Sequence, residues 1–411
     1  MICPIHHNVF NKVAGVMTFL IALIVLILNS STVSAQDVEE EISQKKGFKL
    51  AGIPNLNYNS DDGYGYGARL SLFNHGDGGY SPYFYTVETD ILHTTGGQRR
   101  FIVFFDSPYF LNKNQRLIFE LRYHKNNYSE YYGIGNDTEY HEEFTDSDNP
   151  VNFINKNYYR FRRNRSTLWI NYQRFIGSFK TLAGFGISNT DIELHNGITL
   201  LRTNKDVTGR NGGFTNYLKV GIIYDTRDFE PSPGKGDWTD VILELSGKAI
   251  GSNYDYTRLT FTNRHYFKLM KNVVFAERVI FEKNWGDIPF YEMAFFESSY
   301  KIEEGVGGAK SVRGLLKNRL FGPTKLFGNL ELRWRLFDFR MMKQNFYFSL
   351  NCFSDFGRVW KKDEHISFTD FHLTQGGGIH IGWNENFIFA LDAATSEEVN
   401  MAIYIGVGYL Y

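Results

Sequence analysis

Apolar and polar residues alternate along much of the chain, and this two-residue period is the one that a β-strand produces. Successive side chains of a strand point to opposite faces, so the alternation gives each strand one apolar and one polar face. No convincing helical pattern interrupts the series after the N-terminal region. The chain is therefore predicted to be all-β.

The pattern predicts about sixteen strands, an even number, with the length that a tilted membrane strand needs. They are expected at residues 47–59, 63–74, 80–94, 99–107, 115–125, 165–175, 179–193, 215–225, 237–249, 256–267, 273–282, 325–337, 345–356, 376–383, 387–394 and 401–410. Beyond the N-terminal region no apolar run is long enough for a membrane helix, so strands would have to do any spanning. A transmembrane antiparallel β-barrel is the fold that this series indicates.

The connections between these strands alternate in length. Turns after even-numbered strands are mostly short, as at 177–178, 269–271 and 384–386, whereas long connections follow odd-numbered strands at 126–164, 194–213, 283–324 and 357–375. Outer-membrane barrels combine short periplasmic turns with long external loops. A large soluble β-sandwich, which the composition also allows, has no reason to sort its loops in this way.

The segment 325–337 shows which face should meet lipid. One of its faces carries Leu330, Leu332, Trp334 and Leu336, and the other carries Asn329, Glu331, Arg333 and Arg335. In a closed barrel in lipid the apolar face must point outward. The same alternation places Asp355 of the next strand in the lumen. In the last strand it predicts a lipid face, with an aromatic girdle at its end, made of Ile403, Ile405, Val407, Tyr409 and Tyr411.

The first 35 residues have the pattern of a signal peptide. Lys12 precedes an apolar run that ends at Leu28, and residues 33–35, Val-Ser-Ala, form a small-x-small cleavage site. An uncleaved membrane anchor is the alternative, but the run is somewhat short for a span. We predict a signal peptide at 1–35, a short periplasmic tail at 36–46 and a barrel at 47–411, located in the bacterial outer membrane.

Composition and charge restrict the partners and the chemistry. A formal net charge of −1 over 411 residues gives no electrostatic reason to expect nucleic acid. Cys352 would be alone once the signal peptide is removed, so neither a disulfide nor a cysteine metal site is expected. The histidines show no metal spacing, and the sequence contains no G-x-S-x-G, no H-E-x-x-H and no phosphate-binding glycine loop. We therefore predict no cofactor and no catalytic residue.

One long loop carries the motif that connects this chain with a known family. Residues 307–315 read Gly-Gly-Ala-Lys-Ser-Val-Arg-Gly-Leu, and the strand after them has an inward acid, Glu331. Asp355 follows within residues 353–360, Phe-Ser-Asp-Phe-Gly-Arg-Val-Trp. The order and spacing of these segments resemble the surface-antigen barrels of the BamA/TamA superfamily of outer-membrane assembly factors. The turn at 225–228 and the segment at 133–137 add to this resemblance, which covers the whole barrel.

The resemblance implies that the loop before strand twelve folds back into the lumen. In that family, the arginine of its Val-Arg-Gly tip lies against acidic residues on strands twelve and thirteen. The matching residues here are the tip Val312, Arg313 and Gly314, with Leu315 in place of the usual aromatic, and the acids Glu331 and Asp355. The implied role is a structural clamp, which is not catalytic.

Elementary chemistry is consistent with such a clamp. A guanidinium is always charged and offers five donors in a fixed fork, which two inward carboxylates on adjacent strands could hold. Gly314 would let the loop turn sharply close to the wall. From spacing alone, the alternative is that Arg313 is a solvated loop residue and that both acids are ordinary lumenal polar groups.

One departure from the family concerns the periplasmic POTRA domains, which precede the barrel in members that fold or translocate proteins. About a dozen residues separate Ala35 from the first predicted strand, which leaves no room for such a domain. The chain is therefore expected to resemble the barrel-only branch, and client capture by periplasmic repeats is not expected.

The seam between the first and last strands is the suspected working part of this family. Gly406 and Gly408 lie in the predicted closing strand, and glycine weakens strand pairing. A weak seam could open sideways and bind an incoming strand by β-augmentation, or thin the adjacent lipid. The alternative is that both glycines only make room for lumenal side chains or loops.

The predicted function is insertion, assembly or translocation of protein or lipid at the outer membrane, with a passive channel or porin as the first alternative and a lipid-modifying barrel enzyme as the second. The expected partners are outer-membrane lipid and lipopolysaccharide, and further candidates are client outer-membrane proteins and a periplasmic companion.

Four arginines near the mouth of the third outer loop could contact lipopolysaccharide phosphates, although such runs are more often solvated. They are Arg160, Arg162, Arg163 and Arg165.

Overall fold

The computed structural model describes residues 46–411, except for 61, 81, 113, 231, 302, 342–343 and 384–386. The predicted signal peptide and all but the last residue of the predicted periplasmic tail lie outside the described residues. Within the described part, no helix has the length and apolarity to cross a membrane.

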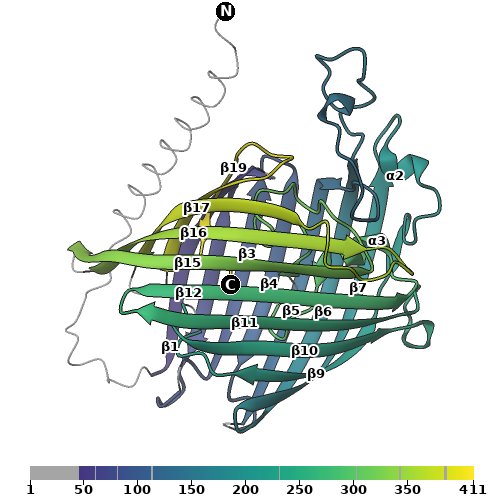
Figure 1. Ribbon diagram of the computed structural model, residues 1–411. Helices are drawn as coiled ribbons and strands as arrows, with labels where there is room; N and C mark the ends of the chain where they lie inside the picture. The colour runs from purple at the N-terminus through teal and green to yellow at the C-terminus, as the bar shows by residue number, and fades with distance from the viewer. Residues whose placement is uncertain are drawn as a thin grey trace, which may run out of the picture. The chain divides into compact units, whose positions relative to one another are not determined.

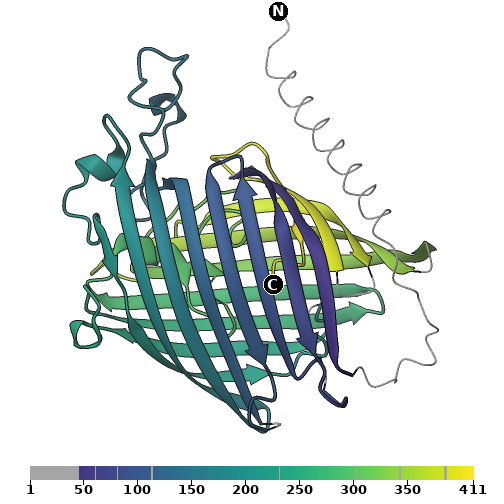
Figure 2. The ribbon, with the colours of Figure 1, turned by 180° about the vertical axis from the view of Figure 1, so that it is seen from behind.

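The strands form one antiparallel sheet that closes on itself into a barrel (Figures 1 and 2). Sixteen strands pair in sequence around the wall, and the last pairs with the first, as predicted. They are β1 (Phe48–Asn59), β2 (Gly63–Asn74), β3 (Tyr85–Thr94), β4 (Gln98–Ser107), β5 (Gln115–Glu130), β6 (Arg160–Ile176), β7 (Phe179–Leu194), β9 (Tyr217–Asp225), β10 (Gly236–Ser246), β11 (Tyr256–Met270), β12 (Val273–Gly286), β15 (Thr324–Met341), β16 (Gln344–Trp360), β17 (His372–Trp383), β18 (Phe387–Thr395) and β19 (Ala402–Val407).

The remaining elements are short. β8 (Gly212–Phe214) is an extra strand that pairs with the end of β7 just before β9. β13 (Phe295–Phe296) and β14 (Glu303–Glu304) pair with each other, outside the main sheet. The described helices are α2 (Leu200–Thr203), α3 (Phe290–Met293), and the 3₁₀ turns η1 (Glu142–Phe144) and η2 (Lys248–Ile250).

The polarity of the barrel is the reverse of that of a soluble protein. On β15 the charged Glu331 is 1% exposed, whereas the neighbouring Leu332 and Trp334 are 36% and 48% exposed. An apolar outer wall around a polar interior is the surface that lipid requires. The predicted faces of this strand are confirmed as far as Trp334. A bulge between Arg335 and Phe337 then shifts the alternation, so Leu336 leaves the predicted apolar face.

Several strands extend beyond their predicted ends. β5 continues to Glu130, β6 begins at Arg160 and β16 continues to Trp360. Because these ends lie beyond the apolar band of a barrel, their outer faces need not be apolar. The alternation that predicts a strand is therefore lost before the strand ends.

The extension of β6 also separates the basic run at its start. Arg163 and Arg165 are buried on the lumenal side, 4% and 6% exposed, while Arg160 and Arg162 lie exposed. Successive strand residues point to opposite faces. The prediction of one basic cluster near the mouth of the third outer loop is therefore wrong.

The connection between β12 and β15 fills much of the lumen. Near its start, Phe290 and Tyr291 are fully buried and pack with Tyr131, Phe161 and Phe321. Its later part packs against the wall residues Ile280, Phe327 and Val359 in a second apolar cluster, whose other members are Phe296, Val306, Val312, Leu315 and Leu320. A connection with two buried apolar clusters is a plug, not a free external loop.

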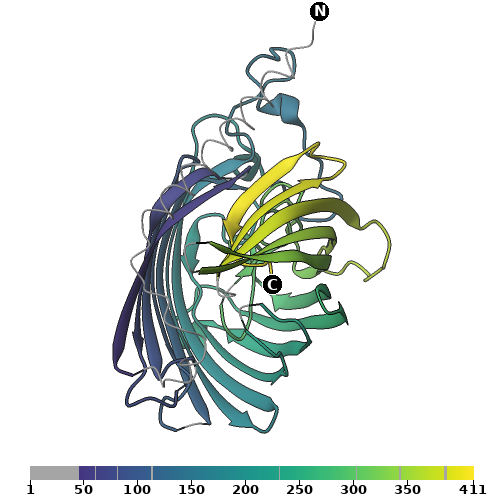
Figure 3. The ribbon, with the colours of Figure 1, turned by 90° about the vertical axis from the view of Figure 1, so that its left-hand side faces the viewer.

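The chain end also lies inside the barrel, between the two walls in Figure 3. β19 ends at Val407, and Gly408 has a φ of 89°, a left-handed conformation that favours glycine. The Tyr411 hydroxyl then donates to the carbonyl oxygens of Ala276 and Asn329 over 2.9 and 3.1 Å. The predicted lipid-facing girdle of Tyr409 and Tyr411 is therefore wrong, because the strand ends before both residues.

Candidate functional site

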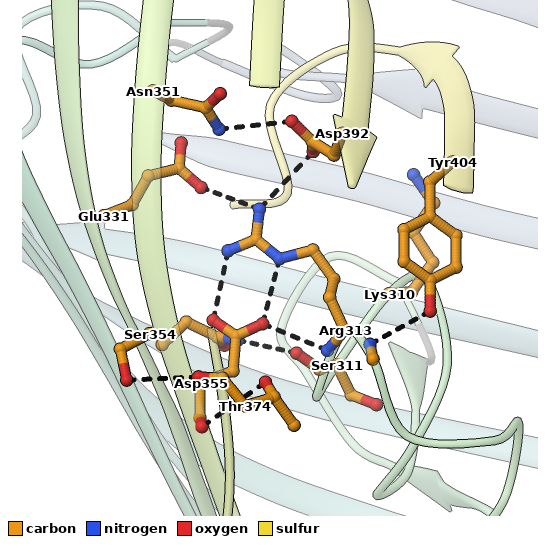
Figure 4. A network of polar contacts seen from close by, with 12 residues as sticks. Lys310, Ser311, Arg313, Glu331, Asn351, Ser354, Asp355, Thr374, Asp392 and Tyr404 are labelled. Carbon is orange, nitrogen blue, oxygen red and sulfur yellow. Dashed lines mark hydrogen bonds and ion pairs between the residues drawn. The ribbon is translucent and has the colours of Figure 1, made fainter. Parts of the chain in front are cut away.

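Arg313 lies at the tip of the inward loop and reaches the wall formed by β15 and β16 (Figure 4). Its Nε and Nη2 donate to the two oxygens of Asp355 over 2.9 and 3.0 Å, which makes a bidentate ion pair. Its Nη1 donates to Glu331 over 2.9 Å. The Arg313 side chain is 2% exposed. The structure thus brings together the arginine and both acids that the sequence singled out.

Further contacts fix the guanidinium from other sides. The Arg313 backbone N–H donates to Asp355 over 3.0 Å, and the guanidinium carbon lies 3.4 Å from the Phe353 ring centroid. A third acid, Asp392 of β18, lies 3.4 Å from Nη1. Sequence reasoning missed Asp392, although alternation within the predicted strand 387–394 places it on the same face as Ala390 and Ala394.

The residues on either side of Arg313 seat the tip. Val312 is fully buried in the second apolar cluster. Gly314 has a φ of 94°, and a Cβ added there would lie 3.1 Å from the carbonyl oxygen of Thr395. The Gly314 N–H donates to the Tyr404 hydroxyl over 3.0 Å, and its carbonyl accepts from the Ser396 hydroxyl over 2.9 Å. Glycine is therefore required by conformation and by space, and the tip also touches β19.

The ion pairs continue from the tip to the chain end. Glu331 accepts from Arg333 over 2.8 Å, and Arg333 also donates to the backbone oxygen of Tyr411 over 3.0 Å. Burial by itself would lower the pKa of the Arg313 guanidinium, but the charges of Asp355 and Glu331 outweigh it and raise that pKa. Arg313 therefore stays charged. Because Glu331 accepts from both Arg313 and Arg333, the loss of one arginine would also change the surroundings of the other.

The seam between β1 and β19 is far less complete than the other pairings of the wall. Its register joins two residues of each strand, Tyr58 with Ile405 and Asn59 with Tyr404. Ser60 adds an N–H bond to the Ile403 carbonyl over 3.0 Å. Residues 48–57 of β1 pair with β2 on one side and, among the described residues, have no register partner in β19.

The two seam glycines occupy different positions. Gly406 lies within β19, whereas Gly408 follows the strand, contrary to the prediction that both belong to it. A Cβ at either position would have no described atom within 4 Å. Neither glycine is therefore needed to make room for a described neighbour.

Comparison with known proteins agrees with this geometry. Residues 85–393 match the family model described as the Omp85 superfamily domain. The chain belongs to the Omp85 superfamily. This match and the BamA-like fold confirm the predicted resemblance, and they identify an outer-membrane β-barrel of an assembly and transport family.

Two solved structures show how far the likeness of this Omp85 barrel extends. BamA from Haemophilus ducreyi lacking POTRA domains 1–3 matches with a TM-score of 0.55 and 13% identity, over 89% of this chain and 70% of that one. CdiB from Escherichia coli matches with a TM-score of 0.56 and 12% identity, over 88% of this chain and 62% of that one. At such identities the likeness is one of fold. No curated protein matches the sequence.

Proposed function

We propose that this barrel inserts or translocates protein or lipid at the outer membrane by opening the β1/β19 seam, while the Arg313 clamp keeps the plug in place. The short register of the seam carries the proposal. An unpaired strand edge presents a row of N–H and C=O groups that can bind an incoming strand. Residues 48–57 of β1 offer such a row on the side that faces β19.

The energy needed to open the wall should differ strongly around the barrel. A net contribution of roughly 0.5–1.5 kcal/mol per hydrogen bond makes the cost depend on the length of the register. Separating β1 from β19 breaks a few bonds near Tyr58 and Ser60, whereas β15 and β16 are paired from Thr324 to Met341. The seam is therefore the place where a lateral opening costs least.

The outer surface beside the seam supports a role at the lipid boundary. Phe48 and Leu50 at the start of β1 are 64% and 75% exposed. Their side chains would meet hydrocarbon where the strand edge is unpaired. We therefore include outer-membrane lipid and lipopolysaccharide among the proposed partners, with client barrels and a periplasmic companion as further candidates.

Both alternative functions have less support. A passive porin needs an open lumen, but the connection that contains Phe290 and Arg313 is buried inside this barrel. A lipid-modifying enzyme gains no support from the Arg313 site, because its acids are already held in ion pairs. We propose that the protein is not an enzyme.

A reversible lock across the seam tests the proposal. Cysteines at the register partners Tyr58 and Ile405, in a Cys352→Ser background, would join β1 to β19. Lipid vesicles that contain the protein should accelerate the folding of a small unfolded barrel added from urea. Oxidation of the cysteine pair should abolish the acceleration, and reduction should restore it.

The matched control places cysteines at Tyr58 and Tyr64, which are register partners in β1 and β2 and do not cross the seam. This lock should leave the acceleration unchanged. Equal acceleration with the seam locked and unlocked would refute the lateral route, and no acceleration by the parent protein would refute insertion of protein clients.

A further inference from the structure

We propose that a cavity in the lumen behind the seam binds a phosphate-bearing headgroup. The cavity has a volume of about 380 Å³ and is bordered by β1 and β19, by the inner faces of β2 to β5 and by the plug. This inference rests on the proposed function, because an opening seam is what would connect the cavity with lipid.

The lining combines apolar and cationic groups. The seam strands contribute Ile53 and Leu56 of β1 and Ile405 of β19. Arg100 of β4 and Arg122 of β5 line the same cavity. This lining suits an amphiphile with apolar chains and an anionic headgroup. The apolar residues of the seam would contact the chains, and the arginines would contact the headgroup.

The acids of the cavity are already occupied. Lys317 pairs with Asp62 and lies 4.0 Å from Glu304. Asp392 lies 3.4 Å from Arg313 and 2.9 Å from His380. No carboxylate that lines the cavity among the described residues is thus left without a cationic or histidine neighbour.

The cations, in contrast, are in excess. Arg69 and Arg100 share one carboxylate, Asp90, over 3.2 and 3.0 Å. Lys310, on the plug, makes no ion pair with any side chain that the structure describes, and it lines the cavity with its side chain exposed there. Extra positive charge inside a protein favours an anionic ligand.

Two buried nitrogen atoms of the same wall also lack hydrogen-bond partners among the described residues. Arg122 pairs with Glu120 over 2.8 Å, but its Nε is buried without a hydrogen-bond partner. The Nε2 atom of His124, next along the inner face of β5, is in the same condition. Buried polar atoms without partners are rare and costly, and an anionic oxygen would satisfy Nε of Arg122.

A phosphate fits this arrangement better than a carboxylate does. Arginine forks match phosphate oxygens, and a lysine adds a point charge. Donors from three separate elements, β4, β5 and the plug, can each find an oxygen on a phosphate, whereas a carboxylate has two oxygens. Lipid headgroups and free phosphate share this chemistry, so the experiment must separate them.

Calorimetric titration of the purified full-length protein in a phosphate-free, uncharged detergent tests the proposal. The probes are dihexanoylphosphatidic acid, whose phosphate monoester has three terminal oxygens, inorganic phosphate and the phosphate-free dihexanoylglycerol. We expect the phospholipid to bind, and Lys310→Gln and Arg100→Gln each to weaken it roughly tenfold, the loss of one charged hydrogen bond. Lys310→Arg should restore most of the affinity.

Arg99→Gln is the matched control, since Arg99 precedes Arg100 on β4 and lies exposed. It should bind like the parent, and heat-modifiable migration on gels should show that every variant is folded.

Binding of inorganic phosphate as tight as that of the phospholipid would assign the site to free phosphate. Equal binding of dihexanoylglycerol, preferential binding of a polyglutamate peptide, or unchanged affinity in both variants would overturn the proposal. Each of these results is independent of whether the seam lock blocks client folding.

Discussion

The β15/β16 wall and the β1/β19 seam belong to the same barrel but are built in opposite ways. β15 and β16 are paired along their whole length, and Arg313 adds two ion pairs on their lumenal face. β1 and β19 share two register pairs, and β19 stops at Val407. A closed sheet has no edges in principle. This barrel keeps one almost open edge and reinforces the wall elsewhere.

The plug tip connects these two regions. Adjacent residues of the tip contact both, since Arg313 bonds Asp355 on β16 and Gly314 bonds Tyr404 on β19. Because the clamp is buried and fully paired whereas the seam is barely paired, we expect the clamp to determine the stability of the barrel and the seam to determine how readily the wall opens. Substitutions in the two regions should therefore separate these effects.

Arg313→Ala should have the largest effect. It leaves Asp355 buried without its bidentate partner, and breaking a buried ion pair costs about 3–5 kcal/mol. The plug should become sensitive to protease, and the unfolding temperature should fall. The control Arg162→Ala removes an exposed pair with Glu193 and should change neither measurement. Equal protease resistance of parent and Arg313→Ala would contradict the clamp.

Gly314→Ala should have the next largest effect. A φ of 94° and a Cβ contact of 3.1 Å with the Thr395 carbonyl oxygen both disfavour any side chain there. We expect a loss of about 2 kcal/mol in the free energy of unfolding, measured by urea titration in detergent. An unchanged midpoint would show that the tip can shift without cost.

Tyr411→Phe tests the tie at the chain end. It removes the hydroxyl that donates to Ala276 and Asn329 but keeps the ring and the backbone oxygen that accepts from Arg333. The expected loss is about 1 kcal/mol in the same titration. If the tail only rests in the lumen, the variant will unfold at the same urea concentration as the parent.

Gly406→Ala should change stability by less than about 0.5 kcal/mol, because the new methyl group would meet no described atom within 4 Å. It should still reduce seam opening, since alanine favours a strand more than glycine does and would favour extending the seam register beyond Ile405. A slower rate of client folding with an unchanged urea midpoint is the expected result. A large loss of stability would mean that Gly406 is tightly packed, which would contradict the view that the seam is weaker than the β15/β16 wall.

Acidification from pH 7.5 to 5.5 should have the smallest effect. Burial would raise the pKa of Glu292 in α3, but Arg165 and Arg258 outweigh it and hold that pKa below its ordinary value of 4.5. A carboxylate with a lowered folded pKa stabilises above its unfolded pKa, and this contribution is lost only as the pH falls through the lowered value. Protease resistance of the plug should thus be equal at both pH values. Lower protease resistance at pH 5.5 would contradict the conclusion that Glu292 remains a paired carboxylate.

The alternation of residues predicted the barrel wall well, because every lipid-facing strand repeats the same constraint. On β15 it placed Glu331 inside and Leu332 outside. It failed at the rims, where no lipid imposes an apolar face, and after Gly408, whose left-handed conformation ends the alternation. The apolar–polar alternation therefore could not predict that the chain turns inward to Tyr411.

The Arg313 site was predictable in part. The Val-Arg-Gly tip and its two acids came from a family pattern, since spacing alone also allowed a solvated arginine. Asp392 was readable from strand alternation but was missed because no motif marked it. The hydroxyl of Tyr404 could not be found from the sequence, because its contact with Gly314 depends on how the plug crosses the lumen.

The position of Tyr411 has a practical consequence for handling the protein. Its backbone oxygen accepts a hydrogen bond from Arg333 in the interior, so an affinity tag fused after Tyr411 would start inside the lumen. The tag would have to displace the tail to become accessible. An epitope inserted beside Val151, which is 86% exposed in the β5–β6 connection, leaves the tail where it is.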